Sequence, residues 1–176
     1  MTTIALVSIL GPDRIGLVAA VADHLYAAGI NLRDVSFAAL GTGAEFIAVC
    51  ELPDDVSTNT LEQELSGLPD LDGSQVRVVP YEFDPNPALT SRVTHRITIS
   101  GGDQLGLVAR LAEIFRQYRA NIVRLEARKL SDTEGGRYET RFAVSIAPED
   151  AALCLAAVSN TAGTLGLASE IQETEL

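Results

Sequence analysis

The spacing of apolar and polar residues divides the first half of the chain into short, regular elements. Residues 3–10 are β-branched and apolar, which predicts a strand, and apolar residues then recur at helical spacing until Gly29. Residues 32–39 and 44–51 have the pattern of two strands around a tight turn, followed by a helix over 58–67 and a strand over 74–82. The predicted order of elements is βαββαβ.

The second half repeats this order. The pattern predicts strands over 93–100, 122–129, 138–146 and 167–173, with helices over 104–118 and 149–162. Between the halves, the stretch "DPNPALTS" has the prolines and polar residues typical of a linker. We therefore expect two domains, 1–84 and 92–176, joined by a linker at 85–91. Each should be an α+β ferredoxin-like sandwich, with helices on one face of an antiparallel sheet.

A short motif marks the two halves as copies of one unit. "GPDRIGLV" at 11–18 returns as "GGDQLGLV" at 101–108, each time between a predicted strand and a predicted helix. With the chain shifted by 90 positions, 8 of the 21 residues from 11 to 31 are identical without a gap. Such self-similarity indicates duplication of a supersecondary unit.

Alternation along the strands assigns residues to the two faces of each sheet. We expect the odd positions of the first strand in each copy to face the helices: Ala5, Val7, Ile9, His95, Ile97 and Ile99. The open face of domain one should then be apolar, formed by Ile4, Leu6, Phe46, Ala48 and Cys50, and covered by another element or subunit. The open face of domain two should be solvated and carry cross-strand ion pairs, formed by Arg96, Arg124, Glu126, Arg128, Glu139 and Arg141.

Charge and composition argue against several kinds of partner and site. The formal net charge is -11, and residues 1–84 hold 3 Arg against 13 Asp or Glu, a net of -10. A surface that binds nucleic acid should be basic, so direct nucleic-acid binding is disfavoured. The N-terminal sequence has neither a signal-peptide pattern nor a membrane-span pattern, which predicts a cytoplasmic protein. Two cysteines are too few for a disulfide scaffold and lack metal-ligand spacing.

The repeated loop has the residue types of a small binding site. We expect Asp13 to cap the following helix, and Gly16 to let a ligand or another chain approach the backbone closely. A helix N-terminus suits a carboxylate, and the amide of Asn31 can both donate and accept. The alternative is purely structural: a cap, tight helix packing and a left-handed turn explain the same three positions without a ligand.

The sequence contains no recognisable set of catalytic residues. Neither histidine has a partner at ligand or catalytic spacing, and no Ser or Cys lies in a nucleophile-elbow context. The acidic residues are spread over predicted helix surfaces and loops. We therefore expect a protein that is not an enzyme and has no cofactor, metal or catalytic residue.

The stretch "SILGPDRIGLVAAVADHLYAAGINLRDVSF" closely resembles the opening of an ACT domain, the βαββαβ amino-acid-sensing module. Its form is most similar to the glycine cleavage system transcriptional repressor family, whose two-domain layout the chain shares. The resemblance implies a ligand where two domains meet. In the first copy it implicates Gly11, Asp13, Arg14, Gly16, Leu17 and Asn31. In the second copy it implicates Gly101, Asp103, Gln104, Gly106, Leu107 and Asn121.

The function expected from this resemblance is regulation without catalysis. A small amino acid, glycine or serine, would bind between ACT domains of a dimer and change contacts with another regulatory protein or an enzyme, so that transcription is affected indirectly and no membrane is involved. A ligand-free dimerisation module is the alternative, and an enzyme-associated regulatory subunit or a deformylase-like or phosphatase-like enzyme is a weaker one. Pro12, Arg14 and Ile30 are replaced in the second copy by Gly102, Gln104 and Ala120, which favours the first site.

Overall fold

A computed structural model describes residues 3–86, 88–130 and 137–174 of the 176-residue chain. Its strands form two separate four-stranded sheets, and the chain divides into the units Met1–Asn86 and Pro87–Leu176. The division falls inside the expected linker 85–91, of which residue 87 lies outside the described part. The predicted pair of α+β units is confirmed.

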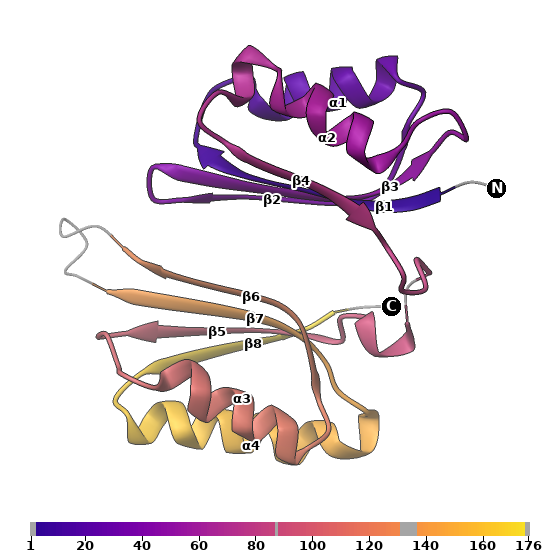
Figure 1. Cartoon of the computed structure of the whole chain (residues 1–176). Helices are drawn as coiled ribbons and strands as arrows, with labels where there is room; N and C mark the ends of the chain where they lie inside the picture. The colour runs from indigo at the N-terminus through magenta and orange to yellow at the C-terminus, as the bar shows by residue number, and fades with distance from the viewer. Residues whose placement is uncertain (1–2, 87, 131–136, 175–176) are drawn as a thin grey trace. The chain divides into compact units, whose positions relative to one another are not determined.

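The first unit has the βαββαβ order. Its elements are β1 (Thr3–Pro12), α1 (Leu17–Ala27), β2 (Asn31–Leu40), β3 (Gly43–Leu52), α2 (Thr58–Ser66), the 3-10 turn η1 (Pro69–Leu71) and β4 (Gln75–Pro80). The strands lie in the antiparallel order β2-β3-β1-β4, and both helices cover one face of the sheet (Figure 1). The buried core lies between that face and the helices, which contribute Leu17, Val21, Leu25, Leu61 and Leu65.

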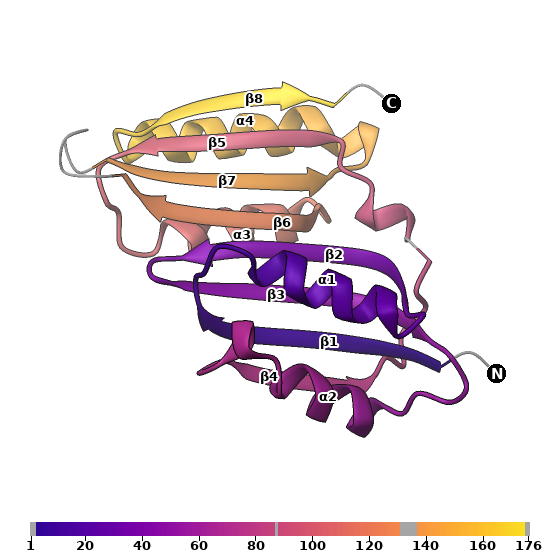
Figure 2. The ribbon, with the colours of Figure 1, turned by 90° about the horizontal axis from the view of Figure 1, so that it is seen from above.

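The second unit repeats this topology after the 3-10 turn η2 (Leu89–Ser91). Its elements are β5 (His95–Gly101), α3 (Leu107–Gln117), β6 (Asn121–Lys129), β7 (Tyr138–Ser145), α4 (Pro148–Thr164) and β8 (Ala168–Glu173). The strand order is β6-β7-β5-β8, with α3 and α4 on one face (Figures 1 and 2). Phe115 of α3 and Phe142 of β7 pack together at the centre of this core, with ring centroids 5.2 Å apart.

The prediction for the first strand is confirmed, whereas the prediction for the third strand is wrong. Ala5, Val7 and Ile9 are all buried against the helices. Phe46, Ala48 and Cys50, expected on the open face, lie directly opposite Ile9, Val7 and Ala5 in the antiparallel register. Directly opposite residues share a face, so all three belong to the helix-side core, where they are at most 1% exposed.

The apolar open face of the first sheet is therefore formed by other residues. It carries Ile4 and Leu6 of β1. It also carries two residues of β3, namely Val49, which is opposite Leu6, and Ile47, which is opposite Ser8. Polar residues lie at both ends of this group, because Ile4 is opposite Glu51 and Leu10 is opposite Glu45. That another element or subunit covers this face stays a prediction.

The charged open face predicted for the second sheet is confirmed. Arg96, Arg124 and Arg141 occupy register positions on the side of the sheet opposite the buried Ile97, Phe142 and Val144. Glu139 of β7 accepts from Arg128 of the neighbouring strand at 3.2 Å and from Arg141 at 2.9 Å. The first of these is a cross-strand ion pair of the expected kind.

Both cysteines are free and buried in the helix-side cores. Burial raises the pKa of the Cys50 thiol and of the Cys154 thiol to about 11, and the nearby Asp150 adds to the effect at Cys154. Within the described residues, no helix combines the length and the apolar character needed to cross a membrane.

Candidate functional site

The loop between β1 and α1 is shaped by a left-handed glycine. Gly16 has φ 94° and ψ -10°, and the Leu17 amide donates to the Arg14 carbonyl at 3.3 Å. This is the geometry of the third position of a type II turn, which favours glycine because other residues are strained at positive φ. A Cβ on Gly16 would meet no atom within 4 Å, so the turn, rather than a close approach of another group, explains this glycine.

The expected capping role of Asp13 is wrong. The cap position is Gly16, and no side chain in the described part of the chain caps α1. The turn formed by Arg14 to Leu17 separates Asp13 from the helix, and Asp13 is exposed, with its backbone amide donating to Thr42. The amides of Val18 and Ala19 consequently have no acceptor among the described residues.

Gly11 is required by packing inside the unit. A Cβ on Gly11 would lie 2.6 Å from the Cβ and 2.9 Å from the Cα of Ser74, closer than real side chains approach. Gly101 has the same position in the second unit, where a Cβ would meet the Cδ2 of Leu167, the end of a flexible side chain next to the start of β8. These first glycines of the motif therefore have a structural explanation without a ligand.

The second loop repeats the geometry of the first. Gly106 has φ 80°, caps α3 without a side chain, and the Leu107 amide donates to Gln104 at 3.2 Å. Leu17 and Leu107 point into the two cores, where their side chains are 2% and 4% exposed. Only their backbone atoms could therefore contact a ligand at the loop. Asp103 is exposed, and Gln104 is partly exposed.

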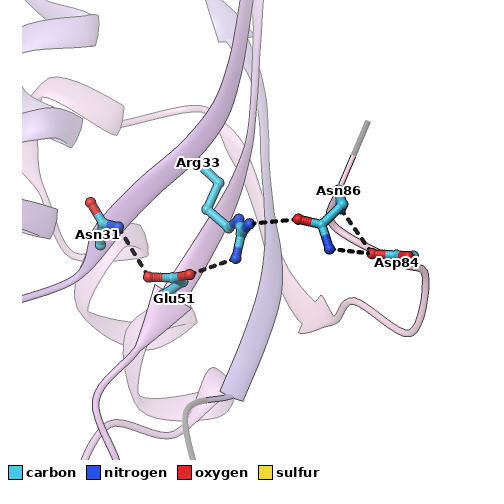
Figure 3. A network of polar contacts seen from close by, with 5 residues as sticks. All are labelled: Asn31, Arg33, Glu51, Asp84 and Asn86. Atoms are coloured by element: carbon cyan, nitrogen blue, oxygen red, sulfur yellow. Dashed lines mark hydrogen bonds and ion pairs between the residues drawn. The ribbon is translucent and has the colours of Figure 1, made fainter. Parts of the chain in front are cut away.

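Asn31 belongs to a different polar group, shown in Figure 3. Its amide donates to the Glu51 carboxylate at 3.0 Å, and Arg33 donates to the other oxygen of that carboxylate at 2.7 Å. Arg33 also reaches Asn86 at 3.5 Å, and Asn86 donates to Asp84 through both its backbone and its side chain. The hydrogen bond from Asn31 and the charge of Arg33 lower the pKa of the Glu51 carboxyl, so it stays ionised.

A β-bulge in β2 lies within this network. The register shifts between Leu32 and Asp34, so Arg33 is an extra residue without a partner on β3. Asn31 and Arg33, two positions apart on β2, both donate to the single carboxylate of Glu51, which lies opposite Asn31. The four side chains that complete the network, namely Arg33, Glu51, Asp84 and Asn86, were missed in the sequence because no short motif links residues so far apart in the chain.

The second unit keeps the bulge and changes its chemistry. The register of β6 shifts between Ile122 and Arg124, which leaves Val123 as the extra residue. Ser145 lies opposite Asn121, at the position of Glu51 in the first unit. The Asn121 amide donates instead to the Thr90 carbonyl at 2.7 Å. The two copies therefore share a backbone and differ at this end of the sheet.

The site residues predicted from the sequence form two groups at opposite ends of a unit. Asn31 is level with Ile4 of β1, through Glu51, whereas the glycine loop begins at Gly11. Gly11 lies seven positions after Ile4 along the strand, which is about 23 Å at roughly 3.3 Å per residue. One free amino acid is much shorter than this, so a single unit does not bring all six predicted residues of a copy around one ligand.

The two groups have complementary chemistry. The loop offers the start of α1 with two free amides and the positive end of the helix dipole, which suits a carboxylate. The other end offers the ionised Glu51 and the amide oxygen of Asn31, which are acceptors for an ammonium group. Among the described residues, no three His, Cys, Asp or Glu side chains are grouped so that they could hold a metal ion.

Two βαββαβ units, each with its helices on one face of a four-stranded antiparallel sheet, define a tandem α+β protein of the ferredoxin-like class. The sequence model of the ACT domain family matches residues 3–79. The first unit is therefore an ACT domain. The second unit repeats this topology and the Gly-x-Asp-x-x-Gly-Leu-Val motif, so both units have the ACT-domain fold.

Solved structures share the complete two-unit fold. A structure described as that of an unknown protein from Galdieria sulphuraria is 21% identical, with a TM-score of 0.77 and coverage of 99% of this chain and 100% of that one. A protein named provisionally as a glycine cleavage system transcriptional repressor is 14% identical, with a TM-score of 0.66 and coverage of 100% and 99%. At these identities the likeness establishes the shared fold. No curated protein matches the sequence significantly.

Proposed function

We propose that this protein is a non-enzymatic regulator that binds a small amino acid, glycine or serine, through its ACT domains in the cytoplasm. The observation that carries the proposal is the uncapped start of α1, where an exposed turn leaves two backbone amides free. Those amides and the helix dipole would receive the ligand carboxylate. The ionised Glu51 and the Asn31 oxygen would receive the ammonium group.

Because the two groups lie at opposite ends of one unit, the proposed site needs the loop of one ACT domain and the Asn31 end of another. This arrangement agrees with the resemblance, which implies ligands where two domains meet. Occupation of the site would favour the arrangement that binds the ligand more tightly and so change a surface that another protein recognises. With a net charge of -11, we expect any effect on transcription to pass through a partner protein.

Calorimetric titration of the full chain with glycine, L-serine and the other proteinogenic amino acids tests this function. Asn31→Ala should weaken binding about tenfold or more, since a hydrogen bond to a charged group is lost. Asn121→Ala is the matched control from the second copy, where Glu51 is replaced by Ser145, and it should leave the affinity unchanged. Absence of heat with every amino acid, together with an unchanged unfolding temperature, would sink the proposal.

The network around Glu51 favours one alternative, a structural module without a ligand. The Asn31 amide and the Arg33 guanidinium already have partners inside the unit, so the group is satisfied without a bound molecule. In that case Asn31→Ala should lower the stability of the first unit while no amino acid binds. The same titration, combined with urea unfolding of the variant, separates the two functions.

A further inference from the structure

The open face of the second sheet has a pocket between three arginines. In the register, Arg124 of β6 and Arg96 of β5 lie on either side of Ala143 of β7. Arg141 lies on the next pair along β7, opposite Thr98 of β5. These residues line a cavity of about 160 Å³. The pocket arises because a small alanine methyl lies between long side chains, so the floor is low and the guanidinium groups form the rim.

The rim has excess positive charge. The lining contains three arginines against Glu126, a net of +2, in a chain whose net charge is -11. The pairing inside the face is incomplete: Arg124 and Glu126 are 3.8 Å apart, and Arg141 shares Glu139 with Arg128. Arg96 has neither an ion pair nor a hydrogen bond to any side chain that the structure describes. Part of the cationic charge is therefore available to an incoming group.

The pocket is too small for most metabolites but large enough for a charged group. Ordinary small-molecule pockets have volumes of about 300–1,000 Å³, whereas this cavity has about 160 Å³. Guanidinium groups donate in a planar fork that matches the oxygens of phosphate and carboxylate. The hydroxyl of Thr98, beside the same cavity, adds a neutral donor.

We propose that this pocket is a binding site for a small oxyanion with two negative charges, namely a phosphate group or a dicarboxylate. The anion would lie over Ala143, with Arg96 and Arg124 donating from opposite sides and Arg141 from the third. The site is formed by the second unit alone and does not use the glycine loops or Asn31. Evidence for or against this anion site therefore does not bear on the proposed amino-acid site.

Titration of the full chain with sodium phosphate and, separately, with succinate tests the site. Sodium chloride keeps the ionic strength constant, and binding is followed by calorimetry and by the unfolding temperature. We expect saturable binding of at least one anion. Arg96→Gln and Arg124→Gln should each weaken it about tenfold to a hundredfold, the loss typical of a charged hydrogen bond. Arg116→Gln removes an exposed arginine of α3 and should leave the affinity unchanged.

The outcomes are distinct. Saturable binding that depends on Arg96 and Arg124 supports the site, and the tighter of the two anions identifies the group. Circular dichroism shows that each variant is folded, which is expected because the substituted side chains are exposed. Binding of neither anion overturns the proposal, as does an equal loss of affinity in Arg116→Gln, which would indicate only a general response to charge.

Discussion

Replacing Gly11 by alanine should destabilise the first unit by about 1–3 kcal/mol, the usual range for inserting a methyl group into a packed site. The new Cβ would lie 2.6 Å from the Cβ and 2.9 Å from the Cα of Ser74. The Ser74 hydroxyl can rotate away, but its Cβ and Cα cannot, so the chain leading into β4 must move. For a domain of this size each kcal/mol shifts the unfolding temperature by about 4–8 °C.

A second substitution makes the origin of the effect testable. Ser74→Gly removes the hydroxyl and the Cβ that the new methyl group meets, so Gly11→Ala should be less harmful in that background. The coupling between the two substitutions should be about 0.5 kcal/mol or more. Gly102→Ala is the control, because a Cβ on Gly102 would meet nothing within 4 Å, and it should change stability by less than about 0.5 kcal/mol.

Urea unfolding and differential scanning calorimetry measure the loss, and hydrogen exchange of peptides from β1 and β5 assigns it to a unit. We expect faster exchange in β1 of Gly11→Ala and unchanged exchange in β5. If Gly11→Ala is as stable as the wild-type chain, or if Ser74→Gly gives no rescue, then Gly11 is not required by this contact.

Three further outcomes are expected. Gly16→Ala should cost about 1–2 kcal/mol in urea unfolding and Gly16→Asn less, because asparagine tolerates the left-handed region; equal losses would contradict the turn assignment. The lowered pKa of Glu51 stabilises the folded state above the unfolded-state pKa near 4.5, and this contribution disappears as the pH falls through the folded-state pKa. Glu51→Gln should flatten that dependence between pH 3 and 7, and an unchanged profile would contradict it. Cys50 and Cys154, with thiol pKa values of about 11, should react with a thiol reagent only after unfolding, so rapid labelling of native protein would refute their burial.

The sequence was most informative where polar and apolar residues alternate. In β7, Glu139 and Arg141 alternate with Thr140 and Phe142, so the exposed side could be assigned before the structure was known. In β3 the run from Phe46 to Cys50 is apolar throughout, and its own pattern does not say which side faces the helices. Only the pairing of Phe46 with Ile9 decides it, and that pairing is a tertiary property.

The sequence indicated which residues belong to the candidate site, but it did not indicate how they are arranged in space. The repeated motif indicated both loops, and their left-handed glycines are compatible with its pattern. Two features depend on local backbone geometry that no spacing reveals: the turn that separates Asp13 from α1, and the bulge that leaves Arg33 without a partner on β3. The separation of Asn31 from the loop follows from the course of α1 along the sheet, which returns the chain to the other end of β1.

The bulge lies at the same position of both units, with a different residue in each. The extra residue is Arg33 in one and Val123 in the other, and neither position has a partner residue on the adjacent strand, so neither is restricted by cross-strand pairing. Val123→Arg together with Ser145→Glu would therefore set an arginine and a carboxylate beside Asn121, in the positions they hold beside Asn31. The same backbone fold, present twice in the chain, can thus carry different polar side chains at the bulge of each unit.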